Sequence, residues 1–248
     1  MMLTTLALLA EEDHEHIRLV TGIPVSDFQR VKEKYRQALL GTHSIRLLQT
    51  DGNWGVDYSV TINEVKIIPQ PVGTLFWAVL GDDGSLINKA CAAGKMAVLD
   101  IGQHTVDLTR TNTLEFVDRE STSFNDIGLF TAYQDLSYEL NSKLGIQIPP
   151  EEMEQYVRSG AVKIGGHMHS IHAEKDAVFQ SAADKILSRA KNTWVNMWEL
   201  DKVLITGGGA MVLGEYLCRA FNNGEICPDA TFTNCLGYYR YGRRVWPR

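Results

Sequence analysis

A short apolar strand near the middle of the sequence delivers an aspartate into a turn that contains glycine. The residues from Ala97 to Asp107 read AVLDIGQHTVD. Gly102 lets the backbone fold closely, so that successive N–H groups face phosphate oxygens, and Thr105 adds a hydroxyl. Asp100, at the end of the strand, is the residue type that holds a hydrated Mg²⁺. The stretch predicts a phosphate and metal site, and the alternative is a plain β-hairpin with a solvated aspartate.

A second glycine turn follows an apolar strand expected at residues 203–206. Gly207, Gly208 and Gly209 open a helix expected at 210–221, and without side chains they let a nucleotide lie against the backbone. The sequence contains neither the P-loop pattern GxxxxGK(S/T) nor the dinucleotide pattern GxGxxG. Two glycine turns of this kind predict a cleft that binds a nucleotide, whereas a GGG run by itself is equally typical of a tight turn.

The elements that position these turns are predicted from apolar spacing and turn residues. Ser26 is expected to cap a helix whose apolar residues from Phe28 to Leu39 fall on one face, and Gly41 ends it. Strands are expected at 44–50, 56–68, 96–101, 105–110 and 113–117, and further helices at 71–80, 126–140 and 171–200. The last three strands suggest a meander, and the mixture indicates an α/β protein.

Composition argues against several classes of function. The 24 Lys and Arg residues are outnumbered by 30 Asp and Glu residues, so no basic field attracts nucleic acid or a membrane surface. The apolar stretch from Leu6 to Ala10 is far shorter than the roughly 20 residues of a membrane span. The four cysteines lack CxxC spacing and are expected to be reduced, which predicts a cytoplasmic protein.

The order of these motifs resembles a known superfamily. DIGxxTxD, a Ser/Asn/Gly helix start at 123–128, a long helix and then GGGA resemble the second domain of the actin superfamily, the ribonuclease-H-like ATPases. Finer features resemble its ParM/StbA plasmid-segregation group: TGIPVS at 21–26, ALLG at 38–41, PQPVG at 69–73 and FTNCLGYY at 232–239. The resemblance covers nearly the whole chain and implies an actin-like two-domain ATPase that binds ATP and Mg²⁺.

The resemblance also implies roles for individual residues. Asp100 would be the metal-associated aspartate, holding Mg²⁺ through water. Gln70 would orient the attacking water, although an exposed loop amide is the alternative for this residue. The nucleotide-binding residues would be Gly102, Gln103, His104 and Thr105 at the phosphates and Gly207, Gly208, Gly209 and Ala210 beside the adenosine.

The implied domain organisation departs from the family at one point. Residues 1–93, with a C-terminal return at 229–248, would form domain I, and 94–228 would form domain II with a small inserted subdomain at about 141–172. The family's first phosphate hairpin, a strand with DxGxxxxK, is expected before all of these elements. Residues 82–89, DDGSLINK, match that pattern but lie too close to Asp100 to belong to the other domain. The sequence is therefore expected to be a truncated or split form with an incomplete first domain.

The implied function is that of an actin-like ATPase that polymerises into filaments and segregates plasmid DNA. Its expected partners are further copies of itself and an adaptor protein bound to a centromere-like DNA site, with no direct contact to nucleic acid or membrane. Two alternatives remain: a degenerate actin-like fragment that acts as a non-enzymatic interaction module, and a sugar kinase of the same superfamily. ATP binding discriminates the first alternative from the ATPase.

Overall fold

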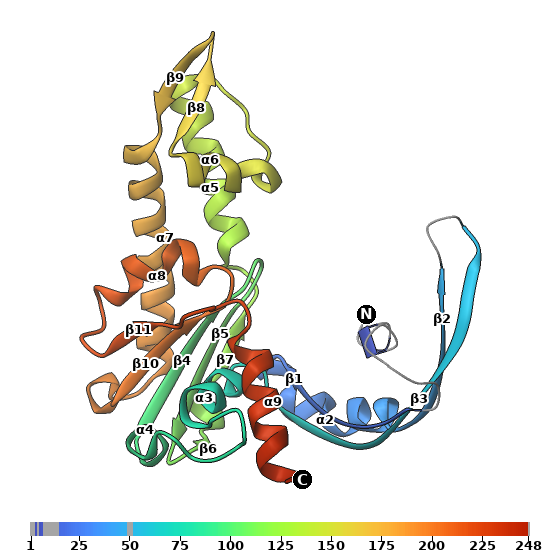
Figure 1. Ribbon diagram of the computed structural model, residues 1–248. Coiled ribbons are helices and arrows are strands. Elements are labelled where there is room, and N and C mark those ends of the chain that lie inside the picture. The colour runs from blue at the N-terminus through green and yellow to red at the C-terminus, as the bar shows by residue number, and fades with distance from the viewer. Residues whose placement is uncertain (1–2, 4, 7–14, 49–51, 248) are drawn as a thin grey trace.

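The computed structural model describes residues 3, 5–6, 15–48 and 52–247. Two main sheets and a two-stranded hairpin organise this part of the chain (Figure 1). No helix among the described residues is long and apolar enough to cross a membrane.

The smaller main sheet is built from three strands, the first of which begins at Glu15 and the last of which ends at Pro69. β1 (Glu15–Ile23) runs parallel to β3 (Trp54–Pro69), and β2 (Gly41–Leu48) is antiparallel to β3. α2 (Val25–Leu39) connects β1 to β2, and its buried Phe28 joins a core with residues of β1 and β3. The strand expected at 44–50 therefore begins three residues earlier, and its last two residues lie outside the described residues.

α2 also begins earlier than the sequence indicated. Pro24, not Ser26, occupies the N-cap position, with an extended ψ of 145°. Ser26 lies in the first turn, where its N–H lacks a partner within the helix. The Ser123 hydroxyl oxygen accepts from this N–H at 3.2 Å, so a distant side chain replaces the expected cap.

The larger sheet has the strand order β11, β10, β4, β5, β6, with β7 (Thr122–Phe124) also paired to β5. β4 (Lys95–Ile101), β5 (Val106–Asn112) and the short β6 (Glu115–Phe116) form the expected meander, and η1 (Asp118–Glu120) follows. β10 (Lys202–Thr206) runs parallel to both β4 and β11 (Gly224–Ile226). Because parallel strands end at the same edge, the two glycine turns that follow β4 and β10 lie next to each other.

Helices cover the larger sheet and extend beyond it (Figure 1). Buried residues of α5 (Leu129–Leu144), α7 (His172–Thr193) and α8 (Ala210–Cys218) share one core with the strands. α5 and α7 run past the sheet and carry a tip at the top of the view. The tip consists of η2 (Pro150–Glu152), α6 (Met153–Ser159) and the hairpin of β8 (Ala161–Ile164) and β9 (His167–Ser170).

The long helix expected at 171–200 is shorter than expected. α7 ends at Thr193, and η3 (Met197–Glu199) follows after Asn196, whose φ of 54° is left-handed. The Val195 N–H donates to the Glu120 carboxylate at 3.1 Å, and the Val195 carbonyl accepts from Arg110. Because Arg110 and Glu120 are themselves a buried ion pair, they hold Val195 away from helical geometry.

Two connections pass between the two main sheets. α3 (Val72–Val79) follows β3 and leads through a loop and α4 (Lys89–Ala93) to β4. α9 (Thr233–Val245) follows β11 and returns to pack against α3 and β1. Residues 82–89 match the pattern DxGxxxxK and lie in the loop before α4 and at its start. They come before the first residue of β4, whereas Asp100 lies near the last residue of that strand.

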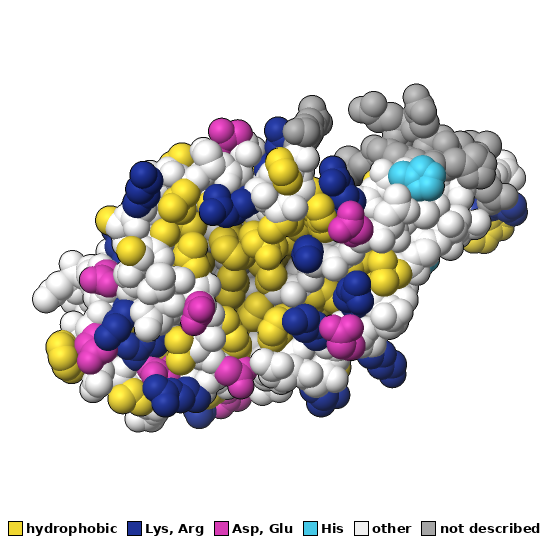
Figure 2. Space-filling view, turned by 90° about the horizontal axis from the view of Figure 1, so that it is seen from below, with side chains coloured by type: hydrophobic (Ala, Val, Ile, Leu, Met, Phe, Trp, Pro, Cys, Tyr) yellow, Lys and Arg dark blue, Asp and Glu magenta, His cyan; other side chains and the backbone are white. Residues whose placement is uncertain are grey.

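The face opposite the tip gathers hydrophobic side chains at its centre. Figure 2 shows this face from below, with charged side chains of both signs around the hydrophobic area. It lies over the end of the molecule where Figure 1 places α4, β6 and the C-terminal end of α9.

Candidate functional site

Two aspartates lie opposite each other where β4 and β5 meet the first glycine turn. Asp100 and Asp107 are register partners across the two strands, and the two residues are 6% and 4% exposed. Burial raises the pKa of Asp100. Burial is also the main cause that raises the pKa of Asp107 to about 6, while a hydrogen bond with Ser123 opposes the shift and the charge of Asp100 adds to it. The sheet thus holds two carboxyl groups in a position where ionising both is costly.

The turn between these aspartates presents free amides. The Gly102 N–H closes the turn by donating to the Thr105 carbonyl at 2.8 Å. The carbonyls of Gly102 and Gln103 accept from the first two N–H groups of α5, at 3.1 and 2.8 Å. No hydrogen bond links the N–H groups of Gln103, His104 or Thr105 to another described residue. The helix therefore occupies the carbonyl side of the turn and leaves successive N–H groups for an anion.

The three glycines after β10 differ in how much space a side chain would have at each position. Gly207 has a φ of +84°, and a Cβ there would lie 2.4 Å from Asp100 Oδ1 and from the Ile101 carbonyl oxygen. A Cβ on Gly209 would lie 2.3 Å from the Ile101 side chain. Gly208 has open space around it. Gly207 and Gly209 therefore let the second turn pack directly on the first, and a nucleotide beside these glycines stays a prediction.

Asp100 is held by a residue from the far end of the chain. The Asn234 side-chain amide, at the start of α9, donates to Asp100 Oδ2 at 2.7 Å. Its Oδ1 accepts from the N–H of Thr74 at 3.1 Å and from the Thr74 hydroxyl at 2.8 Å. Both connecting helices therefore reach the aspartate through one amide.

Gln70 lies where β3 leads into α3. Its N–H donates to the Ile23 carbonyl at 2.8 Å, and its carbonyl accepts from the Tyr238 hydroxyl at 3.0 Å. Gly22 packs closely here, because a Cβ on it would lie 1.9 Å from the Tyr238 hydroxyl oxygen. The backbone of Gln70 is thus fixed beside α9, four residues before Thr74, and its side chain is half-buried.

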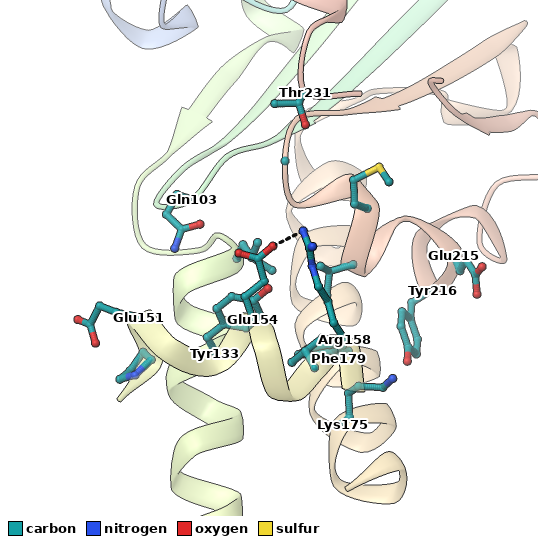
Figure 3. A pocket seen from close by; sticks show the side chains of 16 residues that line it. Gln103, Tyr133, Glu151, Glu154, Arg158, Lys175, Phe179, Glu215, Tyr216 and Thr231 are labelled. Atoms are coloured by element: carbon teal, nitrogen blue, oxygen red, sulfur yellow. Dashed lines mark hydrogen bonds and ion pairs between the residues drawn. The ribbon is translucent and has the colours of Figure 1, made fainter. Parts of the chain in front are cut away.

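A cavity of about 640 Å³ lies between the two glycine turns and the helices of the tip (Figure 3). Gln103 and Gly208 line it from the two turns. Its helical lining is Leu129, Tyr133, Pro150, Glu151, Glu154, Val157, Arg158, Lys175, Phe179, Met211, Val212, Glu215 and Tyr216, from α5, η2, α6, α7 and α8. Its volume lies within the range of small-molecule sites.

Some polar side chains of the cavity already form ion pairs or hydrogen bonds with other side chains. Arg158 forms an ion pair with Glu154 at 2.6 Å, and the Tyr216 hydroxyl donates to Asp176 at 2.7 Å. The buried Tyr133 hydroxyl has no hydrogen-bond partner among the described residues, and burial raises the pKa of Tyr133 to about 12. The lining therefore combines apolar surface with a small number of polar groups, as ligand pockets do.

The residues at the ends of β4 and β5 fit a hydrated Mg²⁺. Oδ1 of Asp107 is buried and has no hydrogen-bond partner among the described residues, and Asp107 is the register partner of Asp100. Mg²⁺ is commonly held by one or two carboxylates and keeps several waters. Across the described part of the chain, no three His, Cys, Asp or Glu side chains gather as a metal cluster. An ion at this point would therefore rely on the two aspartates and on water.

The structure brings together most of the positions predicted from the sequence. Asp100, the turn at 102–105 and the turn at 207–210 meet at one edge of the larger sheet. His104 packs its ring 5.0 Å from that of Phe130, so its side chain rests on α5. Asp107 stood in the predicted motif without a role. Its place in the strand that follows the turn was the signal for one, because a residue opposite Asp100 in an antiparallel pair faces the same side of the sheet. Asn234 was quoted in a motif, but no local pattern indicated that its amide reaches Asp100.

Two family profiles match the sequence. The profile described as the N-terminal domain of actin-like proteins matches residues 1–73. The profile described as the C-terminal part of the archaeal actin homologue MreB-like matches residues 98–219. Together they cover more than half of the chain. The chain belongs to the actin-like proteins.

Solved structures of other actin-like proteins share this fold. Ta0583, an archaeal actin homologue, superimposes with a TM-score of 0.79 at 18% identity, over 99% of this chain and 75% of its own. Its complex with ADP has a TM-score of 0.76 at 20% identity, over 98% and 76% of the two chains. A 15-stranded ParM filament from Clostridium botulinum has a TM-score of 0.72 at 22% identity, over 98% of this chain and 72% of its own. The expected actin-like α/β fold is confirmed. No curated protein sequence matches this chain.

Proposed function

We propose that this actin-like protein binds ATP with Mg²⁺ in the cavity and at the two glycine turns, and hydrolyses it. The observation that carries the proposal is the convergence of Asp100, Asp107 and the free amides of residues 103–105 at one edge of the larger sheet, where Gln103 and Gly208 line the cavity. Phosphates would lie on the amides and the nucleoside in the cavity beside Gly208. The ADP complex of Ta0583 supports a nucleotide ligand for this fold.

Each group of residues at the proposed site would have its own role. The amides of Gln103, His104 and Thr105 would bind phosphate oxygens, and Asp100 with Asp107 would hold Mg²⁺, which would stabilise the negative charge of the phosphates when bound. Gln70 would orient the attacking water through its side-chain amide, without acting as a strong base. Gly207, Gly208, Gly209 and Ala210 would border the adenosine, with Gly207 and Gly209 also holding the second turn against the first.

We further propose that copies of the chain assemble into filaments that move plasmid DNA through an adaptor protein. The ParM structure from C. botulinum is a filament, and an Alp12 filament also matches this chain with a TM-score of 0.66. The hydrophobic area in Figure 2 supports protein contacts, because exposed apolar patches commonly mark them. The net charge of −6 favours an indirect contact with DNA.

Calorimetric titration with Mg-ATP and Mg-ADP tests the nucleotide site, and sedimentation tests assembly. Binding at one site per chain that is lost in Asp100→Ala supports the proposal. A chain that binds neither nucleotide but still self-associates would instead support the non-enzymatic interaction module. A phosphorylated sugar as product would support the kinase alternative.

A further inference from the structure

We infer that Asn234 is a positioning residue that sets the orientation of the Asp100 carboxylate and ties it to both connecting helices. The inference rests on the proposed role of Asp100 at the phosphate and metal site. Asn234 is half-buried, and its amide lies between a carboxylate of the larger sheet and Thr74 of α3.

The hydrogen bonds fix which way the amide faces. An ionised carboxylate only accepts, and the N–H of Thr74 only donates, so Nδ2 of Asn234 must face Asp100 and Oδ1 must face Thr74. A single side chain has to donate on one side and accept on the other. Aspartate at position 234 would place a second acceptor against Asp100, and alanine would leave Asp100 without this donor.

Buried hydroxyls hold Thr74 in turn. Thr74, Thr206 and Thr233 are fully buried, and their hydroxyls are mutual hydrogen-bond neighbours. Thr206 also donates to the Ala230 carbonyl at 2.9 Å. Thr74 donates its hydroxyl proton to Asn234, because the amide oxygen only accepts, and the Thr233 hydroxyl can also donate to the Ala230 carbonyl, at 3.2 Å. The amide of Asn234 is therefore held by a network without free rotation.

The backbone contact between α3 and α9 prevents Asn234 from moving alone. A Cβ on Gly237 would lie 1.7 Å from the Gly73 carbonyl oxygen, and a Cβ on Gly73 would lie 2.6 Å from the Asn234 carbonyl oxygen. At its other end α9 packs on β1, where the Arg18 guanidinium lies 5.5 Å from the Trp246 ring. A change in the angle between the two sheets would therefore act on Asp100 through Asn234.

An exchange of the two side chains tests the pairing without any ligand. Asn234→Asp should lower the unfolding midpoint, because two carboxylates would face each other across a 2.7 Å contact. In an Asp100→Asn background, the same substitution should lower the unfolding midpoint much less, because the side chain at position 100 would then supply the amide of the pair. An equal loss in both backgrounds would overturn the pairing.

The positioning role is tested by metal-dependent binding. Asn234→Ala should leave the affinity for ADP in EDTA unchanged and reduce the gain in affinity from Mg²⁺ about tenfold, as is usual for partners of metal-binding groups. Cys235→Ala, at the adjacent exposed residue, is the matched control and should keep the full gain. Equal losses with and without Mg²⁺ would make Asn234 a structural residue only. If the unaltered chain binds no ADP, the proposed function fails and the metal role with it, whereas the exchange experiment still decides the pairing.

Discussion

Asp100 and Asp107 face the same side of the larger sheet as register partners of β4 and β5, and both are buried. Only the first has a hydrogen-bonding amide on its carboxylate, from Asn234, whereas Oδ1 of Asp107 has no partner among the described residues. Burial of a carboxylate with an unpartnered oxygen is costly, and such sites are commonly functional. The pair is therefore the electrostatic centre of the proposed nucleotide site.

The raised pKa of Asp107 predicts a pH-dependent stability. Its folded pKa of about 6 exceeds the unfolded value near 4, so the folded state binds the proton more tightly and stability falls as pH rises from about 4 to 6. Asp107→Asn should remove this loss of stability and raise the free energy of unfolding at pH 7 by roughly 3 kcal/mol in metal-free buffer. Denaturant titrations at pH 4 and pH 7 measure the difference. An equal effect at both pH values would show that the carboxyl does not titrate in this range.

Local patterns were enough to predict the elements that carry the turns. The strand before Asp100 and the strand before Gly207 are apolar runs that end in glycine, and the structure confirms both. The end of the long helix was not predictable from spacing, because a buried ion pair distant in sequence, Arg110 with Glu120, pulls Val195 out of helical geometry.

The site itself was predictable only in part, for a related reason. Asp100 and the turn at 102–105 stand together in the sequence, so their types and spacing reveal them. The amide of Asn234 reaches Asp100 across 134 positions of sequence, and the cavity is lined from five helices. Contacts of that kind depend on how the connecting helices pack, which local periodicity does not report.

Gly207 and Gly208 form a matched pair of substitutions. Gly207→Ala should destabilise the chain by about 2 kcal/mol or more, because φ is +84° and the new Cβ would meet Asp100 and the Ile101 carbonyl at 2.4 Å. Gly208→Ala meets no atom within 4 Å and should leave the unfolding midpoint nearly unchanged. Thermal unfolding of both variants measures this. Equal unfolding midpoints for the two variants would show that the second turn does not pack closely against Asp100.

Asp100→Ala tests the chemistry of the proposed site. Loss of the carboxylate should lower the rate of ATP hydrolysis roughly 100-fold, because a preorganised metal site typically contributes a few kcal/mol to the transition state. The fold should persist, since the aspartate makes one side-chain hydrogen bond and its charge is costly to bury. Steady-state phosphate release measures the rate, and circular dichroism checks the fold. An unchanged rate would remove Asp100 from the mechanism.

Trp198 provides a test of self-assembly. It is 82% exposed on η3, although the neighbouring Val195 is held rigidly by Arg110 and Glu120. A large aromatic side chain on a rigid turn is typical of residues that dominate an interface, and an open filament needs a surface that meets a different surface on the next copy. Trp198→Ala should therefore raise the critical concentration for assembly about tenfold.

The matched control for this prediction is Tyr138→Ala. Tyr138 is comparably exposed, at 73%, but lies on a different element, α5. Light scattering with Mg-ATP, followed by sedimentation, gives the critical concentration of each variant. Neither substitution removes buried contacts, so unfolding midpoints should match that of the unaltered chain. A critical concentration that rises equally in both variants would indicate a general loss of surface hydrophobicity, and an unchanged value for Trp198→Ala would place the filament contact elsewhere on the molecule.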